Sequence, residues 1–294
     1  MDNPIIIFVF YIVYIGILLS ILYAISKYVF RIADNAVLKN RYGEVRLIWK
    51  IIFLIIFIIV FDGAAACLVS IIYFGSVQEV FLLSSIESLK NAAPGWELVI
   101  ASTILGLSSC LAVWLMVAKL EKKPYPAKEI GWDWRKNTIY QVGLGILVGV
   151  LYAGVVYLYT TVIASIKIVG TIYFFEPSFL SLKSGTIQLM PAIQIILSFI
   201  PRAYAEEVGF RSYLQSRLIE SAGVWKGIFL TSIIFSLMHV AFIPLDYSHF
   251  IFIPLNIAAW WFFGYLFHKT RSLYLVSTIH ASYNIIWYFL FVMK

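Results

Sequence analysis

The chain has 294 residues, of which 62% are hydrophobic and only 13% are charged, and its mean hydropathy is +0.92. A soluble globular protein is about 45–50% apolar and about 25% charged, so this composition excludes an ordinary soluble domain and predicts a chain that lies mostly in lipid. The net charge of +7 does not indicate nucleic-acid binding, because in a membrane protein the positions of Lys and Arg matter more than their sum. Cys67 and Cys110 lie inside apolar runs, and we expect them to be packing residues.

Eight stretches are long and apolar enough to cross a bilayer, which needs about 20 residues. They lie at 5–25, 48–74, 97–118, 141–166, 189–210, 227–244, 249–267 and 273–293. The chain starts Met1-Asp2-Asn3-Pro4, without a basic segment or a cleavage site, which favours a retained first span over a signal peptide. Segments 75–96 and 167–188 are predicted to be extramembrane loops. The sequence therefore predicts an all-α, polytopic membrane helix bundle of about eight transmembrane helices.

The basic residues support this arrangement. Connections 26–50, 119–136 and 268–272, together with the one after the fifth span, fall on one side of the membrane if the spans alternate. They hold most of the 22 lysines and arginines, whereas Arg202 falls within the fifth span. By the positive-inside rule this face is cytoplasmic, and both termini are expected to be extracytoplasmic.

Ionisable residues inside a span cost a few kcal/mol by insertion scales and are functional hypotheses by default. The first unit of them is Glu206-Glu207-Val208-Gly209-Phe210-Arg211. Adjacent helical side chains point about 100° apart, and Glu207 and Arg211 are spaced i, i+4 and can pair. That leaves Glu206 to face another partner, where it could act as a general base. Ordinary surface charges at an interfacial helix end are the alternative.

The second unit, Phe235-Ser236-Leu237-Met238-His239, places one histidine about three turns into an apolar span. A hydrogen-bonded packing histidine is the alternative there. In the third unit, His280 and Asn284 are spaced i, i+4, so both project from one helix face as a pair of donors suited to an oxyanion. An interhelical polar clamp is the alternative for this pair.

The three units together predict one cavity shared by three of the last four spans, because Glu206, His239 and His280 each lie roughly 10–20 Å from the cytoplasmic boundary. His249 and His268 lie at span ends, where polarity costs little, and are left out. The first four spans contain little polar chemistry, with Asp62 as the exception. We expect Asp62 to be an interhelical hydrogen-bonding group or to lie near a span boundary.

In order and spacing, these units resemble the CAAX protease and bacteriocin-processing (CPBP or Abi) family, whose relatives include the type II CAAX prenyl endopeptidases. The family pattern is Glu-Glu-x-x-x-Arg, then Phe-x-x-x-His, then His-x-x-x-Asn, and the sequence carries all three. Phe210, Leu214 and the turn Thr270-Arg271-Ser272-Leu273 also agree with family preferences. The resemblance covers roughly 190–292 and is highly specific, because three motifs match at once.

Two positions depart from the family pattern. Ser212 stands where the family usually has Gly, which we expect to be tolerated at a helix surface. Ile243 stands where some relatives have an asparagine, so a second amide donor must come from Asn284 alone. The resemblance does not extend over 1–188, and it divides the chain into N-terminal spans at 1–188 and an intramembrane protease core at 189–294.

The resemblance implies a glutamate-dependent intramembrane endopeptidase that needs no cofactor. Glu206 would be the base that activates water, and His239 would position that water. His280 and Asn284 would stabilise the oxyanion.

Glu207 and Arg211 would hold the site in shape. The partners implied are the bilayer and a hydrophobic peptide or membrane-protein substrate, such as a pheromone or bacteriocin precursor, which need not be prenylated. We expect the plasma membrane of a prokaryotic cell as the location, no nucleic acid as partner, and leave the oligomeric state open.

Three alternatives remain. A zinc peptidase could use Glu206, His239 and His280 as ligands, although the His-Glu-x-x-His helix is absent and the histidines have no obvious carboxylate partner. A non-catalytic scaffold, or a bacteriocin-immunity or regulatory protein, could bind a peptide or a sensor with the same residues. A transporter would be expected to show repeat symmetry or paired broken helices, and neither is found.

Overall fold

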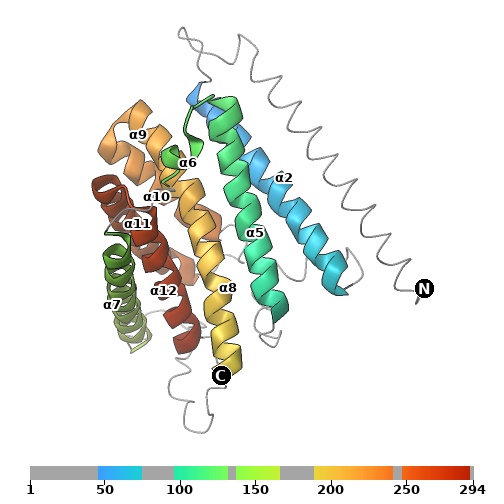
Figure 1. Ribbon diagram of the computed structural model, residues 1–294. Coiled ribbons are helices and arrows are strands. Elements are labelled where there is room, and N and C mark those ends of the chain that lie inside the picture. Colours follow the sequence, from blue (N-terminus) through green and yellow to red (C-terminus); the bar gives the residue numbers. More distant parts are fainter. Residues whose placement is uncertain (1–45, 75–95, 132–136, 166–188, 241–246, 292–294) are drawn as a thin grey trace, which may run out of the picture. The chain divides into compact units, whose positions relative to one another are not determined.

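The computed structural model describes residues 46–74, 96–131, 137–165, 189–240 and 247–291 (Figure 1). Every element in these ranges is a helix, as the sequence predicts. The predicted span at 5–25, loop 167–188 and nearly all of loop 75–96 lie outside the described residues. The chain forms two compact units, Met1–Ile130 and Gly131–Lys294, which are described separately.

In the first unit, α2 (Leu47–Phe74) packs against α5 (Trp96–Leu115), which continues as a short π-helix, η2 (Met116–Leu120). The one-turn helix α6 (Pro126–Glu129) follows. Lys50 Nζ lies 3.4 Å from the buried carboxylate of Glu121 and so links the beginning of α2 to the segment after η2. Asp62 lies on α2, but its side chain is outside the described part of the structure.

The second unit carries all three polar motifs. Its elements are α7 (Thr138–Ser165), α8 (Leu189–Glu207), the π-helix η4 (Val208–Gln215), α9 (Ser216–Ala222), α10 (Val224–Val240), α11 (Tyr247–Thr270) and α12 (Leu273–Phe291). Helix α12 packs against both α7 and α8, and α10 packs against α11. The π-helix η4 contacts α8, α9, α10, α11 and α12, so it is the point where most of the unit meets.

The fifth predicted span and the connection after it form one continuous helical stretch. The chain passes from α8 through η4 into α9 and turns only at Gly223, whose φ of 85° suits glycine. Arg211 and Arg217, which lie in the predicted connection after the fifth span, are both buried within helical turns. Polar contacts inside the unit explain why these charges are not at the surface.

Small residues let α7 approach the backbone of α12 closely. Gln141, Gly145, Gly149 and Ala153 are spaced i, i+4 along the one buried face of α7. A Cβ on Gly145 would lie 2.9 Å from the Leu275 carbonyl oxygen, and one on Gly149 would lie 2.7 Å from the Ile279 carbonyl oxygen. Helix pairs in membranes commonly pack through such small residues one turn apart.

We call this close contact of α7 with α12 the seam. At one end of it, a side-chain contact fixes the beginning of α12. The Ser272 hydroxyl donates to Gln141 Oε1 at 2.6 Å and accepts a hydrogen bond from the Leu275 backbone N–H at 3.1 Å, as a helix N-cap does. Arg271 has a φ of 52°, which ends α11 and allows the two-residue turn into α12. A turn between the last two spans is present as predicted, but it comprises only residues 271 and 272 of the predicted 268–272.

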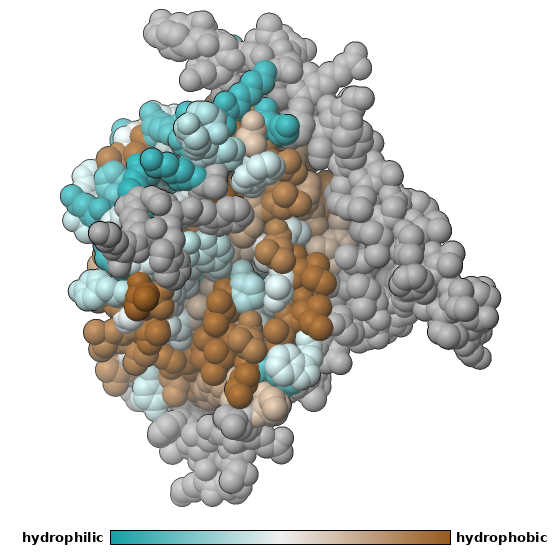
Figure 2. Space-filling model, in the orientation of Figure 1, coloured by the Kyte–Doolittle hydropathy of each residue, from teal (hydrophilic) through white to brown (hydrophobic). Residues whose placement is uncertain are grey.

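Apolar surface dominates the exposed sides of these helices. The stretches Val99–Leu120 and Thr138–Tyr159 are long and apolar enough to cross a membrane, and Leu47–Ile58 and Val224–Met238 are shorter apolar helices. Apolar side chains cover much of the face drawn in Figure 2, and hydrophilic ones gather toward one end. The count of eight spans and the position of the termini stay predictions, because the first predicted span is not described.

The predicted division of the chain between residues 188 and 189 falls inside the second unit, because α7 packs along α12. The seam makes α7 part of the support of α12. Which helices are sufficient for function is a separate question, so the division into N-terminal spans and a core remains a prediction.

The seam yields a test in which one methyl group is added at two positions of α7. We expect Gly149→Ala to destabilise the protein by about 1–3 kcal/mol, because the new Cβ meets the backbone of α12. Gly154→Ala is the matched control, since a Cβ there meets no atom within 4 Å. Equilibrium unfolding by a denaturing detergent measures the stability of both variants. Equal stability would contradict the close packing of α7 against the α12 backbone.

Candidate active site

A buried ion pair anchors the candidate site. Glu207 is the last residue of α8 and Arg211 lies in η4, and both side chains are 0% exposed. Arg211 Nε lies 3.2 Å from Glu207 Oε2, which confirms the pairing that the i, i+4 spacing predicts. The contact is an ion pair rather than a directed hydrogen bond, since among the described residues the guanidinium nitrogens have no hydrogen-bond partner of good geometry.

Aromatic rings enclose the Arg211 guanidinium. Its Cζ lies 5.2 Å from the centre of the Phe235 ring and 5.5 Å from that of Trp260, within the range of cation–π attraction. Phe210 packs edge-on against Phe235 at 4.5 Å, so the first two motifs are in contact. The phenylalanine of the second motif is therefore a wall of the arginine site and belongs to the unit's apolar core.

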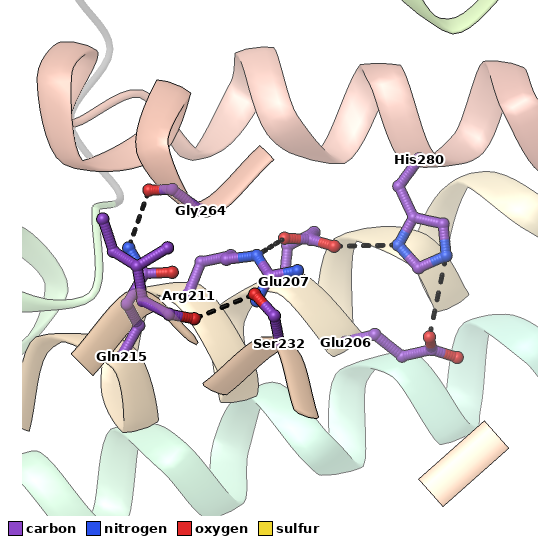
Figure 3. Close-up of polar contacts among 8 residues, drawn as sticks. Glu206, Glu207, Arg211, Gln215, Ser232, Gly264 and His280 are labelled. Atoms are coloured by element: carbon purple, nitrogen blue, oxygen red, sulfur yellow. Dashed lines mark hydrogen bonds and ion pairs between the residues drawn. The ribbon is translucent and has the colours of Figure 1, made fainter. Parts of the chain in front are cut away.

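His280 of α12 lies between the two glutamates of α8 (Figure 3). Its Nδ1 is 2.9 Å from Glu207 Oε1, and its Nε2 is 3.7 Å from Glu206 Oε2. Because a carboxylate only accepts hydrogen bonds, the Nδ1–H donates to Glu207. The Nε2–Glu206 distance is too long for a direct hydrogen bond. The ring packs against Trp260 at 4.8 Å, which fixes its plane.

Glu206 points in a different direction from Glu207, as the angle between neighbouring helical side chains predicts, although both carboxylates lie beside His280. Its side chain is 24% exposed, whereas that of Glu207 is fully buried. Its Oε1 accepts a hydrogen bond from Arg202 Nε at 3.2 Å, one turn earlier on α8. The two glutamates therefore have separate cations and share one histidine.

Gln215 is a site residue that the motifs do not contain. It is fully buried at the end of η4, and its Nε2 donates to the Gly264 carbonyl at 2.8 Å. A Cβ on Gly264 would lie 2.6 Å from Gln215 Oε1 and 2.9 Å from Ile228, so glycine permits this approach. The signal in the sequence is the stripe Glu207, Arg211 and Gln215, each four residues apart.

The remaining predicted residues are His239, Asn284 and Ser212. His239 lies in the last turn of α10, but its side chain is outside the described part of the structure. Asn284 lies one turn after His280 on α12, is partly buried, and makes no hydrogen bond to a residue that the structure describes. Ser212 is 3% exposed, so the expectation that it lies at a helix surface is wrong. It lies in η4, which packs against α10, α11 and α12.

The candidate zinc ligands are Glu206, His239 and His280. Among the side chains described, no group of three His, Cys, Asp or Glu residues could hold a metal ion. This does not test the set Glu206, His239 and His280, because the His239 side chain is not described. The expectation that the histidines lack a carboxylate partner is wrong for His280, since Glu207 accepts its Nδ1–H, an arrangement that also occurs around zinc ligands.

In the comparison with known proteins, part of the second unit matches a protein family. Residues 188–286 match the family model described as Type II CAAX prenyl endopeptidase Rce1-like, and this range holds the three motifs. Searches of curated proteins and of solved structures gave no significant match. Residues 188–286 of this chain therefore form a domain of the Rce1-like family of membrane-embedded type II CAAX prenyl endopeptidases.

Proposed function

We propose that the chain is an intramembrane endopeptidase that hydrolyses peptide bonds of hydrophobic or membrane-associated peptides and proteins. The observation that carries the proposal is the position of His280 between Glu206 and Glu207, within a domain that matches a protease family. Costly ionisable groups that converge in an apolar unit are expected at a functional site. A scaffold that only binds a peptide would not need a carboxylate with one buried oxygen beside a histidine.

In the proposed reaction, Glu206 takes a proton from water while the water oxygen attacks the carbonyl carbon of the scissile bond. The carbonyl electron pair moves to oxygen and forms a tetrahedral oxyanion. The C–N bond then breaks, and the proton held by Glu206 passes to the leaving amine. One water is consumed, and the products are a carboxylic acid and an amine.

His280 and Asn284 are proposed to donate hydrogen bonds to the oxyanion, and His239 to orient the water. An imidazole that donates from Nδ1 to Glu207 can donate from Nε2 only when both nitrogens carry hydrogen. Glu207 has a role in this proposal beyond shape, because its carboxylate accepts the Nδ1–H and so fixes the orientation of the ring. Arg211 in turn holds Glu207 in place through the buried ion pair.

The substrates that suit this site are apolar segments that reach it from the bilayer. We expect peptide precursors such as pheromones or bacteriocins, or membrane-protein tails, without a requirement for a prenyl group. The proposed location is the plasma membrane of a prokaryotic cell, with multiple spans and extracytoplasmic termini.

The role of Glu206 is tested by Glu206→Gln, which keeps the size of the side chain and removes the base. We expect loss of at least about 10²-fold in the rate of peptide hydrolysis, the low end of the effect of a general base. Comparative mass spectrometry of membrane and secreted peptides from wild-type and Glu206→Gln cells identifies the substrates. If a cellular phenotype of deletion is fully rescued by Glu206→Gln at normal expression, the peptidase does not explain that phenotype.

The coupling of Glu207 to His280 is tested with two variants. Glu207→Gln leaves Arg211 as a buried unpaired charge, so we expect a destabilisation of about 3–5 kcal/mol together with loss of activity. Adding Arg211→Met removes the unpaired charge, and we expect stability to recover while activity stays low. If the double variant regains activity with stability, Glu207 serves only to hold the fold.

Metal dependence is tested by chelation of the purified protein. We expect hydrolysis of a Glu206-dependent peptide to continue after treatment with EDTA and with 1,10-phenanthroline, because in the proposed reaction side chains alone activate the water and stabilise the oxyanion. Loss of activity that zinc restores would assign Glu206, His239 and His280 as metal ligands instead.

A further inference from the structure

Arg202 is a charged residue in α8 that the family motifs do not include. Its side chain is 61% exposed, and its Nε donates to Glu206 Oε1 at 3.2 Å. It lies within the stretch predicted as the fifth span, directly after Pro201. A cation in such a stretch is costly unless it pairs or reaches water, so its position calls for a role.

The two oxygens of Glu206 have different surroundings. Oε1 accepts the hydrogen bond from Arg202 on the exposed side of α8, whereas Oε2 is buried and faces His280 Nε2 at 3.7 Å. The two oxygens of a carboxylate are chemically equivalent, and a glutamate side chain has several rotatable bonds. A cation that holds one oxygen from outside therefore determines where the other one points.

An ordinary surface ion pair is the simpler interpretation of this contact. Helical i, i+4 pairs contribute about 0.3–0.5 kcal/mol to stability, and exposed pairs often contribute nothing measurable. That interpretation predicts no effect of Arg202 on the rate of a reaction at Oε2. The other exposed basic residues of the unit provide a comparison, because Lys226 at the start of α10 also carries a positive charge at the surface.

We propose that Arg202 is a positioning residue for Glu206, which holds Oε1 so that Oε2 is directed at His280 and the reacting water. This inference rests on the proposed peptidase function. The positive charge makes the hydrogen bond from Arg202 Nε–H to Oε1 stronger than one from a neutral donor. Because Arg202 does not touch the reacting atoms, its removal affects how often the base is correctly oriented, and not how the substrate is bound.

The test uses the full-length protein in phosphatidylcholine vesicles and an internally quenched hydrophobic peptide that the wild type hydrolyses. We expect Arg202→Ala to lower kcat by about 10- to 100-fold, the scale of a misplaced catalytic group, and to leave KM within about twofold. Arg202→Lys restores most of kcat, and added guanidinium ion partly rescues Arg202→Ala. Arg202→Glu lowers kcat further, because two like charges then lie one turn apart.

Lys226→Ala is the matched control, since it removes the same charge from the exposed surface of the same unit. We expect it to keep wild-type kcat. Equal kcat for Arg202→Ala and wild type, or a loss that neither lysine nor guanidinium reverses, overturns the proposal. Glu206→Gln in the same assay separates the two accounts: if it is as active as wild type, the proposed peptidase function fails, whatever Arg202 does.

Discussion

The ion pair between Glu207 and Arg211 is the constraint on which the rest of the site depends. Both side chains are fully buried in an apolar unit, and transfer of each charge out of water costs several kcal/mol. The surroundings offset this cost with opposite charge, with the faces of Phe235 and Trp260, and with the Nδ1–H of His280. Loss of either charged partner leaves the other charge uncompensated, and the rings and His280 come from the other motifs and from α11, so the motifs act as one network.

The helix that carries His280 must be held at a definite depth for this network to form. Ser272 and Gln141 fix the beginning of α12, and the Gly145 and Gly149 positions let α7 lie against its backbone. On the other side, α12 packs against α8, which carries both glutamates. The support from α7 thus connects a helix with little polar chemistry to the geometry of the proposed reaction.

Much of this arrangement could be predicted from the sequence, because apolar length and i, i+4 spacing are local properties. The helices, the Glu207–Arg211 pair and the different directions of the two glutamates follow from them. The π-helix that begins at Val208 could not be predicted, since local spacing does not reveal its contacts with α10, α11 and α12. The pairing of His280 with Glu207 was missed for a related reason: spacing along α12 does not reveal what α8 presents to it.

The claim at the centre of this account is that Glu206 activates water and does not itself attack the substrate. A single-turnover hydrolysis in water labelled with heavy oxygen, followed by mass spectrometry of the peptide product and of the protein, tests it directly. The account predicts that the label enters the new carboxyl group of the product in the first turnover and that the peptide containing Glu206 stays unlabelled. Unlabelled product in that turnover, with label at Glu206, would contradict the account, because it would mean that the glutamate had formed a covalent bond to the substrate.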